Sequence, residues 1–228
     1  MRLKEEYFSH INIENLAIPG GSPLTGLEIV ERAIKRKPRI IVVEINILSR
    51  GVDSDLVARY RGTTLPAEML RPVRAFAAFL QPKPPAIQKM DMLTREAILH
   101  SEPIPTASAL QKIWIETVPE YNKPIYDAVI KQDATTLESL VNKLRANRVT
   151  VYLFEMPVSP EHSHTRYYRT MREEISRRFQ PDDMLQLKYA LSELHWSDGS
   201  HLDERSALIV SDALENAIAK KLGLEAMR

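Results

Sequence analysis

Apolar and polar residues follow one another along this chain with the periods of strands and helices in turn. Residues 11–17 alternate and predict a short strand that runs into a turn at 19–21. Apolar residues then recur at helical spacing behind a capping-box pattern, until Pro38 ends the predicted helix. Residues 40–47 are almost continuously β-branched, as in a strand buried on both faces. Strand, helix and strand in this order predict a βαβ unit and a parallel sheet.

The next ninety residues have a different pattern. Nine prolines divide residues 55–145, so only short helices fit between them. The clearest is expected near Thr136 to Arg145, where four apolar residues share one face. We interpret 55–145 as a helical insertion within a single domain that spans residues 1–228.

The sheet pattern resumes after the insertion. Residues 149–155 predict a third strand, and a helix is expected over about 166–179. A short strand is predicted at 184–187. The final helix should run from about Glu204 to Leu222, with two lysines in its last turn. The predicted fold class is α/β.

Composition removes several classes of function. The 228 residues include 31 Lys and Arg against 30 Asp and Glu, a net charge of +1, so no nucleic-acid partner is expected. The chain has no cysteine, which excludes a disulfide framework, a thiolate zinc site and a cysteine nucleophile. No apolar run approaches the roughly 18 residues of a membrane span, and the first residues do not resemble a signal peptide.

Candidate functional residues follow the predicted strands at their carboxyl ends, where open parallel sheets bind ligands. These residues are Gly20 and Gly21 after the first strand, Asn46 in the second and Glu155 at the end of the third. The loop 195–201 follows the fourth strand. Their common placement predicts one site built from distant parts of the chain.

Asp198 and His201 stand three residues apart just before the last helix. A carboxylate at this spacing orients an imidazole and stabilises its charged form, as a general base requires. Alternatively, Asp198 forms an Asx turn and His201 packs near a helix start. In a third interpretation, His195, Asp198 and His201 hold a metal, with His162 and His164 as a second cluster. Nothing in the sequence brings the two clusters together, so no metal is expected.

Gly20 and Asn46 could form an oxyanion hole, from a backbone N–H and a side-chain amide. Their alternative roles are a turn glycine and a polar strand end. Glu155 is either a second acid or a solvated strand end. Phosphate binding at Gly20 and Gly21 is disfavoured, because neither dinucleotide-binding nor P-loop glycine spacing is present.

Three segments carry a resemblance to a known family. Residues 15–21 (NLAIPGG), 44–46 (EIN) and 198–202 (DGSHL) resemble the second, third and fifth blocks of the SGNH, or GDSL-type, hydrolases. The resemblance implies a three-layer flavodoxin-like fold with a parallel sheet of strand order 2-1-3-4-5. It also implies ester hydrolysis or O-acyl (acetyl) transfer on a small-molecule or carbohydrate ester, without a cofactor.

The same resemblance assigns roles to residues. A serine would be the nucleophile, His201 its base and Asp198 the group that orients His201. Gly20 and Asn46 would form the oxyanion hole. The third block departs from the family pattern G-x-N-D, since Glu44 and Ile47 flank Asn46 there. Such degenerate blocks are similar to members that act on O-acetyl groups of cell-envelope polysaccharides.

The family's first block, a strand that ends in the nucleophilic serine, is missing. It should lie some thirty residues before Gly20, but only nineteen residues precede this glycine. Ser9 precedes a predicted strand instead of following one, and Ser22 suits a helix cap. We therefore expect an N-terminally truncated and inactive form, without a nucleophile in this chain. An upstream segment would also carry any export signal, so no compartment is predicted.

The missing block would be the central strand of the sheet. Without it a sheet edge stays unpaired, and self-association through that edge is expected. The alternative function is a non-catalytic glycan-binding or assembly module that kept the fold. Trp196 and the pair Tyr167 and Tyr168 could then stack on a sugar, or else belong to the core.

Overall fold

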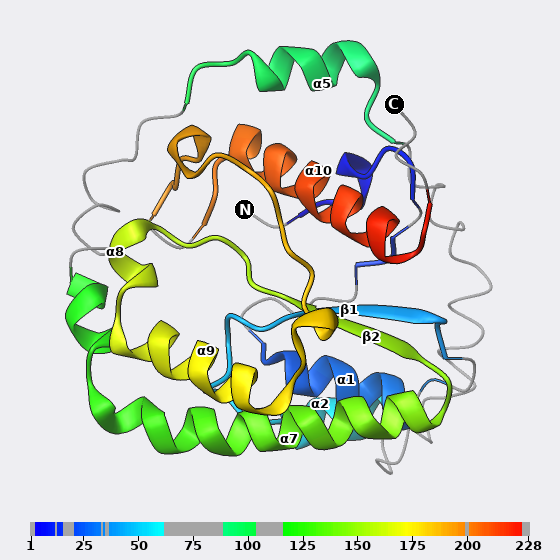
Figure 1. Ribbon diagram of the computed structural model, residues 1–228, viewed down its shortest axis with the longest axis vertical. Helices are drawn as coiled ribbons and strands as arrows, with labels where there is room; N and C mark the ends of the chain where they lie inside the picture. Colours follow the sequence, from blue (N-terminus) through cyan, green and yellow to red (C-terminus); the bar gives the residue numbers. More distant parts are fainter. Residues whose placement is uncertain are drawn as a thin grey trace.

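Within the part of the chain that the structure describes, the sheet consists of two parallel strands (Figure 1). The computed structural model describes residues 3–11, 13–15, 21–32, 34, 37–61, 89–103, 116–198 and 201–224. Strand β1 (Ile40–Glu44) pairs with β2 (Thr150–Phe154), in a register that places Ile40 opposite Thr150. Both strands are shorter than the predicted ranges 40–47 and 149–155, and β1 leaves the ladder before Asn46. The expected α/β character is confirmed.

A third segment reaches the sheet at one point only. Leu153 and Met184 form an isolated parallel bridge, and the Leu185 N–H donates to the Leu153 carbonyl over 2.8 Å. The strand predicted at 184–187 is therefore a single bridge beside β2. The observed order is β1, β2 and then this segment.

The two faces of the sheet bury different sets of side chains. Ile41 and Val43 join the main apolar cluster with Leu153. Val42 and Phe154 point the other way and join a cluster with Leu214 of the last helix. Alternation along a strand therefore gives the sheet two apolar faces, each of which needs a cover.

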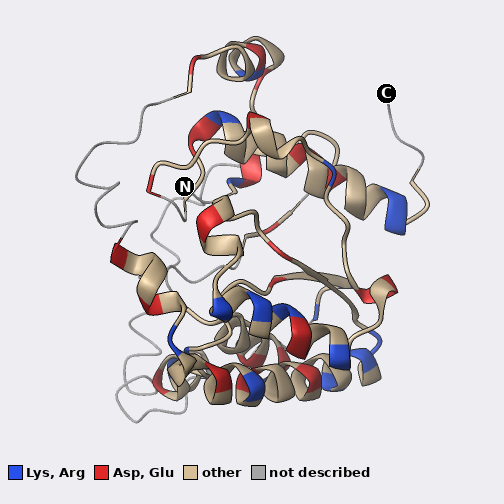
Figure 2. Ribbon diagram, turned by 60° about the vertical axis from the view of Figure 1, so that its left-hand side comes forward, with Lys and Arg blue, Asp and Glu red and all other residues tan. Residues whose placement is uncertain are grey.

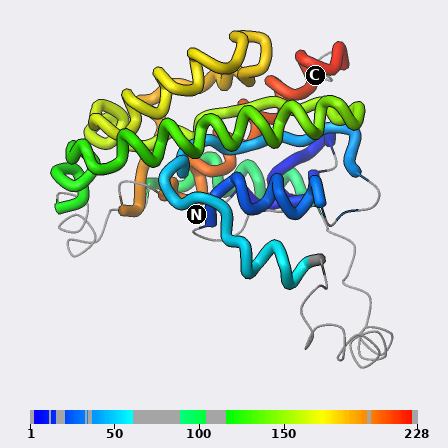
Figure 3. The backbone as a smooth tube through the Cα atoms, turned by 90° about the horizontal axis from the view of Figure 1, so that it is seen from below, coloured from blue at the N-terminus to red at the C-terminus, as the bar shows by residue number. Residues whose placement is uncertain are grey.

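Helices lie on both sides of the sheet (Figure 1). Below it in that view are α1 (Pro23–Arg32), α2 (Ser54–Arg61), α7 (Asp127–Ala146) and α9 (Arg166–Arg178). Figure 3 shows these four side by side, in the order α9, α7, α1 and α2. Above the sheet lies α10 (Glu204–Lys221), against which α5 (Met92–Leu99) packs.

The long helix α7 is part of the main core. Its buried residues include Leu137, Leu140, Val141 and Leu144, the face predicted from spacing. It contacts α1, α9 and β2, so it connects the two strands as a crossover helix does. The C-terminal part of the expected insertion is thus an integral layer of the fold. Residues 62–88 and 104–115 of that insertion lie outside the described residues.

Shorter elements complete the described chain, and residues 116–121 are helical as well. They are η1 (Glu5–Tyr7), η2 (Pro124–Tyr126), α8 (Pro160–Ser163), η3 (Pro181–Asp183) and η4 (Leu191–Glu193).

The strand predicted at 11–17 is wrong where the structure describes it, at residues 11 and 13–15. The backbone near its start is satisfied in another way. The N–H groups of Ser9, His10 and Ile11 donate to the buried Glu215 carboxylate of α10, over 3.0, 2.6 and 2.7 Å. A carboxylate that accepts several backbone N–H groups replaces a strand neighbour and fastens this segment to α10.

The two edges of the sheet differ. Backbone groups of a parallel strand point alternately to its two sides, and the Ile45 N–H donates to the Phe154 carbonyl. Ile40, Val42 and Glu44 therefore direct their backbone groups away from β2, and in the described part of the chain these groups have no hydrogen-bond partner. At the other edge, the Arg145 guanidinium donates to the Val151 carbonyl over 3.1 Å. The β2 edge is thus covered, whereas none of the described residues pairs with the β1 edge.

Charges are mixed along the helices, with Lys and Arg beside Asp and Glu (Figure 2). Among the described residues, no helix is both long enough and apolar enough to cross a membrane.

The Glu215 interaction makes a testable prediction. Glu215→Gln keeps the size of the side chain but removes its charge and one acceptor oxygen. We expect the free energy of unfolding to fall by about 1–3 kcal/mol, since hydrogen bonds to charged groups contribute the most. Urea unfolding followed by circular dichroism measures it. Glu96→Gln, on the exposed side of α5, is the control and should change stability by less than about 0.5 kcal/mol.

Candidate functional site

The turn before α10 brings Asp198 and His201 together. The His201 backbone N–H donates to Asp198 Oδ1 over 2.8 Å, and the His201 Nδ1 lies 2.7 Å from Asp198 Oδ2. A carboxylate only accepts hydrogen bonds, so Nδ1 carries the proton and Nε2 has a free lone pair. Both expected interactions of Asp198, the Asx turn and the imidazole contact, are present at once.

Short contacts fix this turn in place. Trp196 and Leu202 form an antiparallel bridge across it, and the Ser197 N–H donates to the His201 carbonyl over 2.7 Å. Asp203 then caps α10 by accepting from the Ser206 N–H over 2.8 Å. The cap explains why the sequence turns here, since Asp is a preferred N-cap residue. Gly199 and Ser200 lie outside the described residues.

The side chain of His201 is largely exposed to solvent. Its side chain is 62% exposed, against 29% for Asp198. Within the structure's described ranges, Nε2 has no hydrogen-bond partner. The pair therefore presents an oriented proton acceptor to whatever binds beside it.

Asn46 occupies the carboxyl end of β1, where its side chain connects the two strands. Its Nδ2 donates to the Met156 carbonyl over 2.8 Å, and its Oδ1 accepts from the Met156 N–H over 2.7 Å. The Asn46 side chain also opposes the rise that burial causes in the pKa of Tyr168. Asn46 is buried and its amide is engaged, so the structure places it as a clamp between β1 and the segment after β2. Gly20, its expected partner in an oxyanion hole, lies outside the described residues.

Glu44 is an exposed acidic residue at the carboxyl end of β1, to which the sequence analysis assigned no role. It stands opposite Phe154 at the end of the ladder, and its side chain is open to solvent. Desolvation by the surrounding protein raises the pKa of its carboxyl, and the charge of His201 opposes this rise. In the sequence, Glu44 stands out only as the first residue of the EIN segment, where the G-x-N-D pattern of the SGNH hydrolases has glycine.

Glu155, the other acid considered, forms an ion pair. Its carboxylate accepts from Arg172 Nε over 3.0 and 2.9 Å and from Nη2 over 2.5 Å. Arg172 also binds Ser163 through Nη2 over 2.8 Å. This strand end is a fixed connection to α9.

His162 is buried between two hydroxyl groups. Its Nδ1 lies 3.0 Å from Ser159 Oγ, and its Nε2 lies 3.1 Å from Thr117 Oγ1. Burial lowers the pKa of His162, although the charges of Glu161 and Asp198 oppose this. Within the described ranges, no group of three His, Asp or Glu side chains is arranged to hold a metal ion.

The aromatic residues considered for sugar stacking are buried. Tyr167 is 3% exposed, Tyr168 6% and Trp196 8%. The Tyr167 hydroxyl donates to the Asn46 carbonyl over 3.1 Å, and Trp196 Nε1 donates to the Pro157 carbonyl over 3.3 Å. Of the alternatives to sugar stacking, the core or the rim, their burial favours the core.

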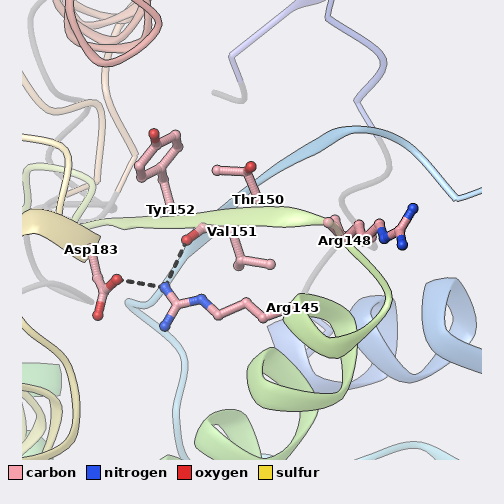
Figure 4. A pocket seen from close by; sticks show the side chains of 7 residues that line it. Arg145, Arg148, Thr150, Val151, Tyr152 and Asp183 are labelled. Carbon is pink, nitrogen blue, oxygen red and sulfur yellow. Dashed lines mark hydrogen bonds and ion pairs between the residues drawn. The ribbon is translucent and has the colours of Figure 1, made fainter.

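A pocket lies away from these residues, at the amino end of β2 (Figure 4). Arg145, Arg148, Thr150, Tyr152 and Asp183 are among the residues that line it. Figure 4 shows Arg145 directed toward Asp183, with which it forms an ion pair of 2.6 Å. The pocket thus surrounds Arg145, whose guanidinium pairs with Asp183 and covers the outer edge of β2.

Comparison with known proteins adds no relative: no family model, no curated protein and no solved structure matches this chain.

The buried imidazole predicts how stability depends on pH. Because the folded state holds the pKa of His162 below its ordinary value of 6.5, the unfolded state binds the proton first as pH falls. The stabilisation is complete above about pH 6.5 and is lost below it. His162→Gln keeps polar atoms near both hydroxyls but cannot be protonated. Urea unfolding measures the free energy of unfolding at about pH 7.5 and about pH 5.5. Between these two values, the natural chain should lose more of this free energy than the variant does. If both proteins lost the same free energy of unfolding, His162 would not be the source of the pH dependence.

Proposed function

We propose that this chain carries the acid–base half of an SGNH-like ester hydrolase or O-acyl transferase. The observation that carries the proposal is the hydrogen-bonded pair of Asp198 and His201, in which the His201 side chain is exposed and its Nε2 has no hydrogen-bond partner among the described residues. The DGSHL segment supports the assignment, as does the position of this turn between the sheet and α10.

The arrangement suits a simple chemical sequence. A hydroxyl group placed beside Nε2 gives its proton to His201 while its oxygen attacks the acyl carbon. Asp198 keeps the ring oriented and stabilises the imidazolium. The imidazolium then returns the proton to the departing alcohol oxygen as the ester bond breaks. Water or a sugar hydroxyl would accept the acyl group in the second half of the reaction.

The sheet gives a place for the missing nucleophile. On the outer edge of β1, the backbone groups of Ile40, Val42 and Glu44 find no partner among the residues that the structure describes. A strand that paired there in parallel would end beside the carboxyl end of β1. In the flavodoxin-like order proposed for this chain, the serine-bearing strand occupies this position.

The proposal predicts an activity that depends on the upstream strand. The chain of 228 residues alone should hydrolyse p-nitrophenyl acetate at the background rate, because it lacks the nucleophile. A longer form with a serine-bearing upstream strand should be active, and His201→Ala in that form should lower kcat/KM by about 10²–10⁴-fold. His195→Ala, a substitution of an exposed histidine in the same loop, is the matched control and should change little. Full activity in the His201→Ala form would refute the proposal.

The second candidate is a non-catalytic assembly module, which is favoured by the β1 edge, since no described residue pairs with it. Strand edges without charge or cover pair readily with other chains. In sedimentation velocity between about 10 µM and about 1 mM, the chain should show a rising sedimentation coefficient. Ile40→Lys places a charge at this edge and should reduce the association.

Thr150→Lys supplies the matched control for this experiment. Thr150 lies opposite Ile40 in the ladder and is exposed, but it belongs to the neighbouring strand. The same charge there should leave the association unchanged. A chain that stays monomeric throughout the concentration range would count against assembly through this edge.

A further inference from the structure

The pocket at the amino end of β2 lies apart from the candidate site. Asn46 marks the carboxyl end of the paired strands, whereas the pocket is lined by Arg145, residues 148–152 and Asp183. Its volume of about 370 Å³ falls in the range of roughly 300–1,000 Å³ that is typical of sites for small organic molecules. The proposed ester chemistry uses none of the lining residues, so the pocket needs an explanation of its own.

Only one nitrogen of the Arg145 guanidinium is engaged. Its Nη2 donates to the Val151 carbonyl over 3.1 Å and to Asp183 Oδ1 over 2.6 Å. Asp183 is itself held, because its Oδ2 accepts from the Gln180 N–H over 2.9 Å. A guanidinium has five N–H donors, and those on Nε and Nη1 of Arg145 find no partner among the described residues. This guanidinium is therefore fixed in place and still has donors for an anion.

The backbone of β2 adds a donor on the same side. The Thr150 N–H donates to the Arg39 carbonyl over 2.9 Å, so the backbone groups of Thr150 point toward β1. Alternation then directs the backbone groups of Val151 to the outer edge, where its carbonyl accepts from Arg145. Within the described part of the chain, the Val151 N–H has no hydrogen-bond partner. A backbone N–H that lacks a partner at the wall of a pocket is available to a ligand.

Arg148 brings a second guanidinium to the pocket from an uncommon backbone conformation. Its φ is 63°, and it is the only non-glycine residue with a positive φ among those described. The Arg148 N–H donates to the Arg145 carbonyl over 2.9 Å and the Val149 N–H to the Leu144 carbonyl over 3.1 Å, which ends α7. Glycine is the usual residue at this position, because a side chain there is strained. A role of the Arg148 side chain in the pocket explains why an arginine is found here.

Positive charge predominates around the pocket. The lining contains two guanidinium groups and one carboxylate, that of Asp183. Arg39 comes to the same end of the sheet, because it immediately precedes β1 and its carbonyl binds Thr150. Neither Arg39 nor Arg148 forms an ion pair with a described residue. Such an excess favours a ligand with more charge than one carboxylate, and a phosphate monoester carries about −1.5 to −2 at pH 7.

We propose that this pocket binds a small phosphorylated organic molecule, of about the size of a sugar phosphate. The donors of Arg145 and the Val151 N–H bind the phosphate oxygens, and Arg148 adds positive charge. Thr150 and Tyr152 project from the same side of β2 (Figure 4) and offer a hydroxyl group and a ring to the organic part of the ligand. The site lies at the opposite end of the sheet from Asn46, so it does not rest on the proposed esterase function.

NMR titration of the ¹⁵N-labelled chain tests the proposal with inositol monophosphate as the probe. The signals of the Val151 amide and of Arg145 Nε should shift and saturate between about 0.01 and about 10 mM of the probe. Inositol has no phosphate and should shift neither signal. Inorganic phosphate should shift both but bind more weakly, because it lacks the organic part. The proposal is overturned if inositol monophosphate causes no saturable shift, if inositol shifts the signals equally, or if inorganic phosphate binds as tightly.

Two arginine variants separate a built site from a general attraction of charge. Arg148→Asn removes the guanidinium but keeps a residue that tolerates positive φ, and it should raise the Kd for inositol monophosphate about 2–5-fold. Arg145→Lys keeps the charge but loses the planar set of donors, and the expected rise is about 10-fold. Lys131→Gln is the matched control, since it removes an exposed charge from the other end of α7 and should leave the Kd unchanged.

Circular dichroism confirms that each variant is folded. Arg145 also supports β2, whereas Arg148 forms no side-chain hydrogen bond or ion pair with a described residue. Arg148→Asn therefore tests the site even if Arg145→Lys does not fold. An unchanged Kd in Arg148→Asn, or an equal rise in Lys131→Gln, would contradict the proposal.

Discussion

The parallel pairing of β1 with β2 is the constraint on which the rest of this structure depends. A two-stranded sheet with apolar side chains on both faces is stable only when both faces are covered. The layer of α1, α7 and α9 covers one face, and α10 covers the other. The same pairing aligns the carboxyl ends of the strands, so Glu44, Asn46 and the segment after β2 come together at one end.

Asn46 converts this alignment into a fixed geometry. Its side chain binds both backbone groups of Met156, on the segment that follows β2. Trp196 adds a contact from the loop before α10 to Pro157 of the same segment. Three stretches distant in sequence therefore share one rigid support, and His201 projects from it with an exposed ring. In the proposed esterase, such support on one side and free access on the other would let His201 act as a base.

Several features of this site were predictable, and others were not. The Asp198 and His201 pair was, because a spacing of three residues before a capped helix is a local property. The helices α1, α7, α9 and α10 followed from apolar periodicity. The pairing of Glu155 with Arg172 was not predictable, since the two come from a strand end and a helix face. Residues 11–15 have a strand-like alternation, yet Glu215 of α10 takes the nearby amides.

The sequence by itself determined the local patterns: the α/β order of elements, the buried strand at β1, the capped start of α10 and the contact between two residues three positions apart. These depend on periodicity and on short-range hydrogen bonds, which a sequence contains directly. Tertiary structure alone decided that Asn46 would be a buried clamp and that Tyr167 and Tyr168 would be core residues. Each of these features depends on which surfaces pack together across the sheet. The free energy of that packing comes from contacts between segments that are distant in sequence, so no single segment contains it.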